Sequence, residues 1–446
     1  MKYKEYLLGQ KDNMVEELMR FVSYNSVNDE STVAEGAPFG AGVRDALEYV
    51  AQLGEQYGFE VDRCDGYCTE LTIGEGDKMI GIFAHADVVP ATGEWKSDPF
   101  APYVEDGKVF GRGTSDDKGP FVAAFYAVLA LKEEGLLKGY KVRFVVGGNE
   151  ELGSRCLDYY FKVLNKPSPT YGFTPDADFP LIYGEKGIND FFPEIPIEIP
   201  HVKSIHGGAA TNAVCDKVDI ELDDPTLFAE YCEKRGVEHV VNGNVLTIIG
   251  KSAHGSTPEL GINAAVIAMS LLGEFYGVAK LRRLGVGLRD TSGKNWDAFC
   301  ETKLMGKTTY CVGTICFENN LLQFSVNFRY PDGVNPVEYK DKFDFYFGTE
   351  SRMGEESHLL FFDPKSKLVK TLMKAYKSET HDIFSKPITI GGGTYAKHCE
   401  NTVAFGAMFP GRESTMHQPN EYMLLDDIVK SAQIYAKAIY LLGKLK

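Results

Sequence analysis

The sequence predicts an α/β protein in which a mostly parallel sheet with flanking helices carries an inserted α+β domain. Three observations predict this fold class. Apolar runs alternate with helical patterns in the first part of the chain, as in strand–helix–strand units. Between 188 and 361 the pattern changes to short β-type segments around one helix. Polar motifs follow several predicted strands, stop at 176 and resume only at 417.

The first elements are predicted from the spacing of apolar side chains. Residues 9–25 and 43–57 carry them at helical intervals, so each segment predicts an amphipathic helix. β-type runs follow at 59–63, 67–73 and 79–84. The last run is continuously apolar, as expected of a strand that is buried on both faces. It ends at His85, and the carboxyl ends of such strands are where open α/β sheets bind ligands.

The next elements lead to further polar motifs. Asp106-Gly107 stands between two short β-type runs and predicts a hairpin. A helix is predicted from 119 to 134, and the strand over 141–146 ends just before Glu150-Glu151. Residues 169–185 continue the alternation and contain the segment Thr-Pro-Asp-Ala-Asp-Phe-Pro.

The remaining elements complete two domains. The inserted domain contains β-type segments at 218–222, 245–249 and 323–328 and a helix near 262–275. After it come a helix over 367–377, a Gly-Gly-Gly-Thr loop, a strand over 403–408 and a closing helix over 424–442. We therefore predict a first domain made of residues 1–187 and 362–446, and an inserted domain of residues 188–361.

Composition narrows the classes of function. A chain of 446 residues with 44% hydrophobic and 25% charged residues is ordinary for a soluble enzyme. Its net charge of -16 argues against nucleic-acid and anionic membrane partners. Apolar runs are too short for a membrane span, and the N-terminus lacks the apolar stretch of a signal peptide. Nine scattered cysteines do not suggest a disulfide framework, so we expect a cytoplasmic protein.

Carboxylates and imidazoles dominate the polar motifs. They occur in His85-Ala-Asp87, in the Asp116-Asp117 pair, in Glu150-Glu151 and beside His417. Carboxylates balance the charge of divalent cations, and neutral imidazole adds a nitrogen donor. These motifs together predict a two-metal hydrolase. Taken singly, His85 could be a packed histidine, and the glutamate pair could be an ordinary helix start, where carboxylates suit the helix dipole.

The order of these motifs resembles the co-catalytic metallopeptidase family of aminoacylases, carboxypeptidase G and desuccinylases. Three segments are similar specifically to its peptidase V-type dipeptidases: Gly-Arg-Gly-Thr-Ser-Asp-Asp-Lys-Gly-Pro at 111–120, Thr-Pro-Asp-Ala-Asp-Phe-Pro at 174–180 and Tyr-Gly-Glu-Lys-Gly at 183–187. Asn-Glu-Glu, Gly-Gly-Gly-Thr and Met-His-x-Pro-x-Glu follow in the family's order, so the resemblance covers essentially the whole chain.

The resemblance implies two groups of metal ligands that share one residue. Asp116 would bridge the cations, and members of the family hold the peptide bond after this residue in the cis form. The ligand positions of the first metal match His85 and Asp176, with Asp178 as an alternative to Asp176. Those of the second metal match Glu151 and His417.

The resemblance also implies catalytic and substrate-binding roles. Glu150 matches the general base, and Asp87 matches the residue that receives the other ring N–H of His85. His254, in Gly-Lys-Ser-Ala-His-Gly, matches the histidine that stabilises the oxyanion. A cradle for the α-carboxylate of the substrate matches Asn212, Arg329 and the backbone N–H groups of Gly392, Gly393 and Thr394.

Two of these assignments leave alternatives open. Arg329 could instead be a solvated arginine at a strand end. Relatives commonly read Asn-x-Val-Pro where this chain has Asn212-Ala-Val-Cys215, which weakens the assignment of Asn212.

The expected function is hydrolysis of dipeptides that carry a free C-terminal carboxylate. The alternatives are an N-acyl amino-acid deacylase or carboxypeptidase of the same family, and a non-catalytic peptide-binding protein. Two divalent cations are expected, zinc first, with manganese or cobalt able to occupy the same donors. The expected partner is a small peptide substrate. The inserted domain is long enough to cover a cleft within one chain, so a monomer is expected.

Overall fold

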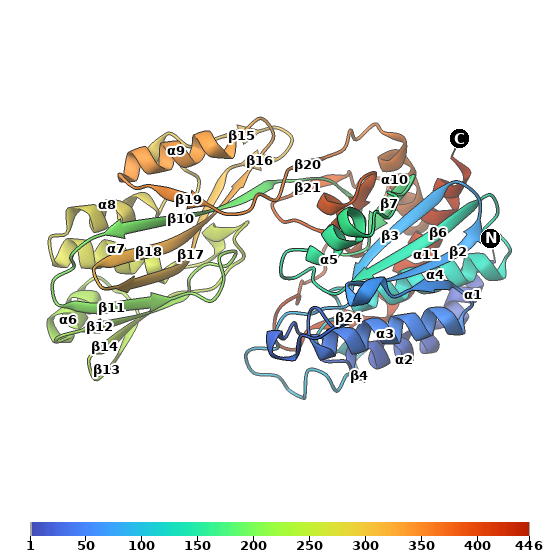
Figure 1. The fold of residues 1–446 in the computed structure, drawn as a ribbon, viewed down its shortest axis with the longest axis horizontal. Coiled ribbons are helices and arrows are strands. Elements are labelled where there is room, and N and C mark those ends of the chain that lie inside the picture. The colour runs from blue at the N-terminus through green and yellow to red at the C-terminus, as the bar shows by residue number, and fades with distance from the viewer. Residues whose placement is uncertain (1, 446) are drawn as a thin grey trace. The chain divides into compact units, whose positions relative to one another are not determined.

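The computed structural model describes residues 2–445, and the chain forms two compact units (Figure 1). Unit 1 comprises Met1–Gly184, Phe361–Ile388 and Gly393–Lys446, and unit 2 comprises Glu185–Leu360 and Thr389–Gly392. The predicted domain limits at 187/188 and 361/362 lie near these boundaries. The short segment Thr389–Gly392 groups with unit 2, whereas the sequence placed it in the first domain. The predicted α/β class is confirmed.

The main sheet of unit 1 is mixed. Its strands, in spatial order, are β1 (Glu60–Asp62), β2 (Cys68–Glu75), β6 (Tyr140–Gly147), β3 (Met79–His85), β7 (Tyr171–Thr174), β22 (Thr402–Ala404), β9 (Ile182–Glu185) and β20 (Leu360–Phe361), and β21 (Ile388–Ile390) also pairs with β9. The central strands β6, β3, β7 and β22 are parallel, whereas the pairs β1–β2, β2–β6 and β9–β22 are antiparallel. Parallel pairing therefore joins the four central strands. Every residue of β3 is buried, as its continuous apolar run predicts.

Helices cover both faces of this sheet. On one face, Phe121 and Phe125 of α4 pack on Phe144 of β6, and Tyr435 of α11 stacks on Phe173 of β7. On the other face, Phe161 of the π-helix Tyr159–Val163, which follows α5, packs against Phe83 of β3. The helices of unit 1 are α1 (Tyr3–Gly9), α2 (Lys11–Val22), α3 (Ala41–Gln56), α4 (Lys118–Glu133), α5 (Arg155–Asp158), α10 (Lys367–Thr380) and α11 (Leu425–Lys444).

Two small sheets of unit 1 lie next to polar motifs. Strands β4 (Tyr103–Glu105) and β5 (Lys108–Phe110) form the predicted hairpin, and β24 (Tyr422–Leu424) adds to β5. Strand β8 (Ala177–Asp178) pairs with β23 (Ala407–Met408). The prediction of one strand over 403–408 was therefore wrong, because the chain leaves the main sheet after Ala404 and pairs again elsewhere.

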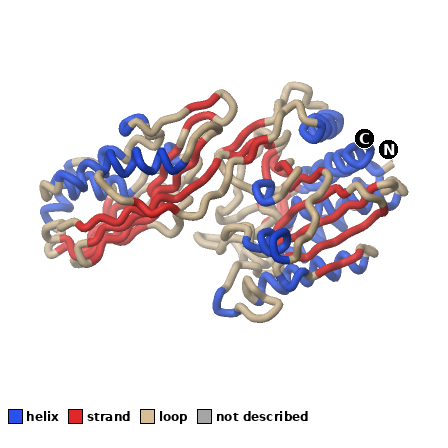
Figure 2. Tube along the Cα trace, turned by 45° about the horizontal axis from the view of Figure 1, so that its top comes forward, coloured by secondary structure: helices blue, strands red, loops and turns tan. Residues whose placement is uncertain are grey.

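Unit 2 is a sheet with helices packed on it (Figure 2). Its strands, in spatial order, are β13 (His239–Asn242), β14 (Val245–Ile249), β12 (Lys217–Leu222), β11 (Val202–Gly207), β17 (Thr309–Glu318), β18 (Leu321–Tyr330), β10 (Gly187–Pro196) and β19 (Ser351–Met353), and a two-stranded sheet joins β15 (Glu301–Thr302) to β16 (Gly306–Lys307). The helices are α6 (Thr226–Lys234), α7 (Ala264–Phe275), α8 (Ala279–Gly287) and α9 (Pro336–Phe347). All pairs in the larger sheet are antiparallel, as expected of an α+β domain.

Each unit has its own hydrophobic core, so each can hold its functional side chains in place by itself. Among the residues described, no helix is long and apolar enough to cross a membrane.

Candidate metal centre

His85 ends strand β3 and is fully buried. Its Nδ1 lies 2.9 Å from the backbone carbonyl oxygen of Asp87, which can only accept a hydrogen bond, so Nδ1 carries a proton. Nε2 faces Asp116 Oδ1 at 2.8 Å and Asp176 Oδ2 at 3.7 Å. In the neutral ring, the lone pair of Nε2 therefore points at carboxylate oxygens, an arrangement that a cation between them would stabilise.

Asp116 faces two histidines with its two carboxylate oxygens. Oδ1 lies 2.8 Å from Nε2 of His85, and Oδ2 lies 2.9 Å from Nε2 of His417. The peptide bond between Asp116 and Asp117 is cis, which confirms the form that the resemblance implies. Asp116 thus stands between two groups of polar side chains and belongs to both.

The two groups have the composition of divalent metal sites. One contains His85, Asp116 and Asp176, and the other contains Asp116, Glu151 and His417; in each, one ligand atom per residue lies within 4.8 Å of the others. Asp178 belongs to neither group. Nitrogen and oxygen donors of this kind suit zinc, manganese or cobalt.

Buried negative charge accumulates at this centre. Burial and the charge of Asp116 raise the pKa of Asp176 to about 8. Burial and the charge of Asp176 raise the pKa of Glu150 well above its usual range. Burial alone would lower the pKa of His85, yet the nearby carboxylates, Asp116 foremost, raise it well above the ordinary value. Positive charge between these buried carboxylates would therefore stabilise their ionised forms. The histidines and carboxylates of the two groups fit a pair of divalent cations.

The carboxylate of Asp87 has a different partner from the one predicted. The Nδ1 atom of His85 contacts the backbone carbonyl of Asp87 at 2.9 Å, while the nearer carboxylate oxygen is 3.5 Å away. That carboxylate accepts the backbone N–H groups of Glu150 at 3.0 Å and Glu151 at 3.2 Å. Asp87 therefore fixes the backbone of the glutamate pair, because its buried charge is satisfied by these amides.

Sequence reasoning gave no role to Asn28 and Asn149. Asn28 donates to Asp87 Oδ2 at 3.3 Å, and Asn149 donates to Asn28 Oδ1 at 2.9 Å. The amides thus complete the contacts of the buried carboxylate. The position of Asn149 directly before the glutamate pair could have indicated its role from the sequence. Asn28 lies in no motif, so nothing in the sequence indicates its role.

Sequence reasoning also missed the role of Glu421, the last residue of the Met-His-Gln-Pro-Asn-Glu segment. It is fully buried. One of its oxygens accepts the N–H and the hydroxyl of Ser115 at 2.8 and 2.9 Å, and the other accepts the N–H of Gly113 at 3.1 Å. Glu421 thus fastens the loop that ends at Asp116. Its place in the motif was visible, but its partners were not.

A second polar cluster lies in unit 2. Arg329 is 2% exposed, which excludes the solvated arginine considered above. Its Nε donates to Asn327 Oδ1 at 2.8 Å, its Nη1 donates to the carbonyl of Gly391 at 2.6 Å, and its Nη2 lies 3.5 Å from Nε2 of His254. Burial lowers the pKa of this guanidinium to about 10, so it stays positively charged at neutral pH. The structure thus brings Arg329 and His254 together.

Other predicted substrate-binding residues divide between the two units. Asn212 is exposed in unit 2, and its carbonyl accepts the N–H of Gly255, next to His254, at 2.7 Å. Gly392 belongs to unit 2, whereas Gly393 and Thr394 belong to unit 1. The hydroxyl of Thr394 accepts the N–H of Ala396 at 3.1 Å.

An α/β unit with two adjoining groups of histidine and carboxylate side chains has the kind of site found in hydrolases of the metallopeptidase class. The model of peptidase family M20/M25/M40 matches residues 81–441, and the chain belongs to this family.

Comparisons with individual proteins agree with this membership. The chain is 35% identical over 476 residues to the Bacillus subtilis (strain 168) protein named "Putative dipeptidase YtjP", with 100% of each chain covered. Its fold is similar to that of human carnosine dipeptidase 1, with a TM-score of 0.62, 16% identity and coverage of 100% of this chain and 98% of the other. It is also similar to Bacillus subtilis YXEP, described as a dinuclear metal binding peptidase, with a TM-score of 0.52, 12% identity and coverage of 97% and 98%.

Proposed function

We propose that this chain is a peptidase V-type metallodipeptidase, which hydrolyses dipeptides with a free C-terminal carboxylate. The observation that carries the proposal is the position of Asp116, whose two oxygens face His85 and His417 at 2.8 and 2.9 Å. One carboxylate that faces two imidazoles suits a pair of cations that share a ligand. The dipeptidase name of the Bacillus subtilis relative supports the substrate class.

The ligands divide into two sets. His85, Asp116 and Asp176 would hold one cation, and Asp116, Glu151 and His417 would hold the other, as their two groups suggest. Bound cations would polarise the scissile carbonyl and favour ionisation of the attacking water. We propose zinc as the metal, with manganese or cobalt as substitutes that the same donors accept.

Glu150 acts as the general base in this proposal. It takes a proton from water as the water oxygen attacks the carbonyl carbon of the substrate. It then gives this proton to the amine nitrogen as the carbon–nitrogen bond breaks, so the base is regenerated. The hydrogen bond from the N–H of Glu150 to Asp87 supports this role, because it holds the backbone that carries the base.

Unit 2 supplies the remaining groups and acts as a lid. His254 donates a hydrogen bond to the oxyanion, and Arg329 binds the α-carboxylate of the substrate with Asn212 and the amides of Gly392–Thr394. The proximity of Arg329 to His254 supports this assignment, because the scissile carbonyl and the α-carboxylate are separated only by the nitrogen and Cα of the C-terminal residue. A planar guanidinium retains further N–H donors beyond those used by Asn327 and Gly391.

We also propose a cytoplasmic monomer. The nine cysteines of the described chain are all free, which fits a reducing compartment. The insertion Glu185–Leu360 is long enough to serve as a lid within one chain.

A substrate panel tests the proposed function. The zinc-loaded protein is assayed with a dipeptide, the matching tripeptide, the dipeptide amide and an N-acetyl amino acid. We expect the dipeptide to have the highest kcat/KM, because a bound carboxylate and a closed lid leave room for one residue on each side of the scissile bond. Faster hydrolysis of the N-acetyl amino acid would make the chain a deacylase, and rapid cleavage of the tripeptide at its C-terminus would make it a carboxypeptidase. Binding of dipeptides without any turnover would make it a peptide-binding protein.

A further inference from the structure

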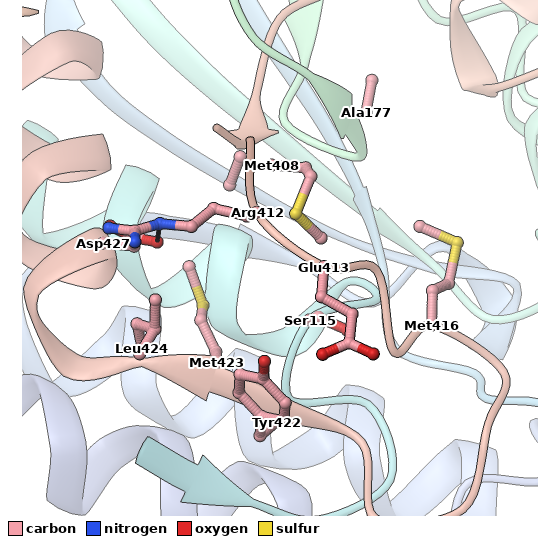
Figure 3. A pocket seen from close by; sticks show the side chains of 11 residues that line it. Ser115, Ala177, Met408, Arg412, Glu413, Met416, Tyr422, Met423, Leu424 and Asp427 are labelled. Atoms are coloured by element: carbon pink, nitrogen blue, oxygen red, sulfur yellow. Dashed lines mark hydrogen bonds and ion pairs between the residues drawn. The ribbon is translucent and has the colours of Figure 1, made fainter. Parts of the chain in front are cut away.

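A pocket in unit 1 is lined in part by chain neighbours of the candidate ligands (Figure 3). Three residues that line it are direct chain neighbours of candidate ligands: Ser115 precedes Asp116, Ala177 follows Asp176, and Met416 precedes His417. Each neighbour shares a peptide bond with its ligand. Three parts of the pocket wall are therefore one residue along the chain from a candidate ligand, and these ligands include members of both groups. Every lining residue belongs to unit 1.

Most of this wall is apolar and flexible. It includes Met408, Met416, Met423, Leu424 and Tyr422 (Figure 3). Methionine side chains have three rotatable bonds and a polarisable sulfur, so they adapt to apolar side chains of different shapes.

The hydroxyl of Ser115 adds little polarity to this wall. It donates to Glu421 Oε1 at 2.9 Å, and the same oxygen accepts the N–H of Ser115 at 2.8 Å. Both polar groups of this residue are therefore used within the protein. Ser115 therefore offers little hydrogen bonding to an occupant of the pocket.

Charge in the pocket disfavours an acidic occupant. Arg412 donates to both carboxylate oxygens of Asp427 at 2.9 and 3.0 Å, so these two charges neutralise each other. This pair stands on the opposite side of the pocket from Met416, and Glu413 lies between them in Figure 3. The carboxylate of Glu413 leaves the lining with net negative charge, which repels a second carboxylate.

We propose that this pocket receives the side chain on the amino side of the scissile bond and selects long, unbranched apolar side chains against acidic ones. This inference rests on the proposed function. In that proposal, Arg329 and Asn212 of unit 2 bind the α-carboxylate of the substrate. We therefore assign binding of the amino-side residue to unit 1, which carries the metal ligands. Three residues of the pocket wall are direct chain neighbours of candidate ligands in that unit.

A series of Xaa-Ala dipeptides measures this selection. With the zinc-loaded wild-type protein, we expect kcat/KM for Met-Ala to exceed that for Ala-Ala by about tenfold or more, because the longer side chain removes more apolar surface from water. We expect Glu-Ala to be hydrolysed more slowly than Ala-Ala, because its carboxylate meets Glu413.

Two variants and a control assign the selection to the pocket. Met408→Trp narrows the cavity and should bring the Met-Ala to Ala-Ala ratio of kcat/KM close to one. Glu413→Gln removes the negative charge and should raise the Glu-Ala to Ala-Ala ratio several-fold. Met19→Trp changes a half-buried methionine of α2 outside the pocket and should leave both ratios as in wild type. The ratios separate selectivity from damage to the fold, because loss of folded protein lowers all rates equally.

The outcomes separate this inference from the proposed function. Unchanged ratios in both pocket variants, with dipeptides still cleaved, would overturn the pocket assignment alone. A wild-type protein that prefers Glu-Ala to Met-Ala would overturn it as well. Failure of the metal-loaded wild-type protein to cleave any dipeptide would overturn the proposed function and this inference with it.

Discussion

Arg112 and Glu421 form an ion pair in the interior of unit 1. Nη1 of Arg112 lies 2.7 Å from Oε2 of Glu421, and each side chain is 1% exposed. Glu421 also binds the loop that ends at Asp116, and it lies four residues after His417. The pair therefore ties the segments that carry two candidate ligands, which are about 300 residues apart in the chain.

Replacement of Glu421 by glutamine should destabilise unit 1 strongly. The variant Glu421→Gln keeps the size of the side chain but leaves the buried charge of Arg112 without its partner. Breaking a buried pair in this way costs about 3–5 kcal/mol of unfolding free energy. Urea denaturation measures the loss. The control Glu48→Gln removes one member of a half-exposed pair with Arg63 and should cost less than about 1 kcal/mol. Equal losses in the two variants would contradict the account.

Replacement of each of the two adjacent glutamates should affect a different property of the protein. Glu150→Gln keeps the shape of the side chain and removes the base, so turnover should fall by about 10² or more while metal content stays near wild type. Glu151→Gln should lower metal content, because Glu151 stands in the group with Asp116 and His417. Elemental analysis beside a dipeptide assay distinguishes the two. The opposite pattern would exchange their roles.

Asp87 should act through the backbone of these glutamates. In Asp87→Asn, one of the two acceptor oxygens becomes an amide NH2 group, a donor that faces a backbone N–H group, so a hydrogen bond is replaced by a repulsive contact. We expect activity or metal affinity to fall by about 10- to 100-fold. Metal titration and dipeptide turnover measure both quantities. Asp45→Asn, in an exposed pair with Arg44, is the matched control and should retain wild-type values; equal effects of the two changes would refute this role.

His254 should be needed for turnover but not for metal binding. His254 lies in unit 2, whereas all candidate ligands lie in unit 1 with a separate core. His254→Ala should therefore fold and bind metal as wild type does, and lose about 10²–10³ in kcat with the oxyanion donor. His206→Ala changes an exposed histidine of the same unit, paired with Glu318, and is the control. A kcat near wild type in His254→Ala would disprove the lid role of unit 2.

Much of the fold follows from the sequence because burial leaves a clear pattern. The continuous apolar run of β3 and the helical spacing of α3 predicted both elements within two residues of their bounds. Helices α6 and α8 were not predicted, because both have only nine residues and few buried positions. The central strands are parallel as expected. The antiparallel pairing of β2 and β9 was not predicted, because it depends on contacts between segments far apart in the chain.

The five candidate ligands were all named from the sequence, but the contacts that support them were not. The motifs named all five residues that the structure gathers into two groups. The carboxylate of Asp87, which was expected to meet the ring of His85, instead accepts the backbone N–H groups of the glutamate pair. A spacing of two residues cannot tell whether the backbone carbonyl or the carboxylate meets the imidazole. Nor can the sequence reveal that Glu421 meets Ser115, because this contact depends on the path of the chain between them.

The central claim is that two cations share Asp116, and metal stoichiometry tests it most directly. The protein is stripped with a chelator, zinc is added back stepwise, and bound metal and dipeptide turnover are measured on the same samples. We expect activity to vanish on stripping and to reach its plateau at two metal ions per chain. Asp116→Asn should bind fewer ions and stay inactive. Full activity in protein that holds one metal ion per chain or fewer would contradict the account.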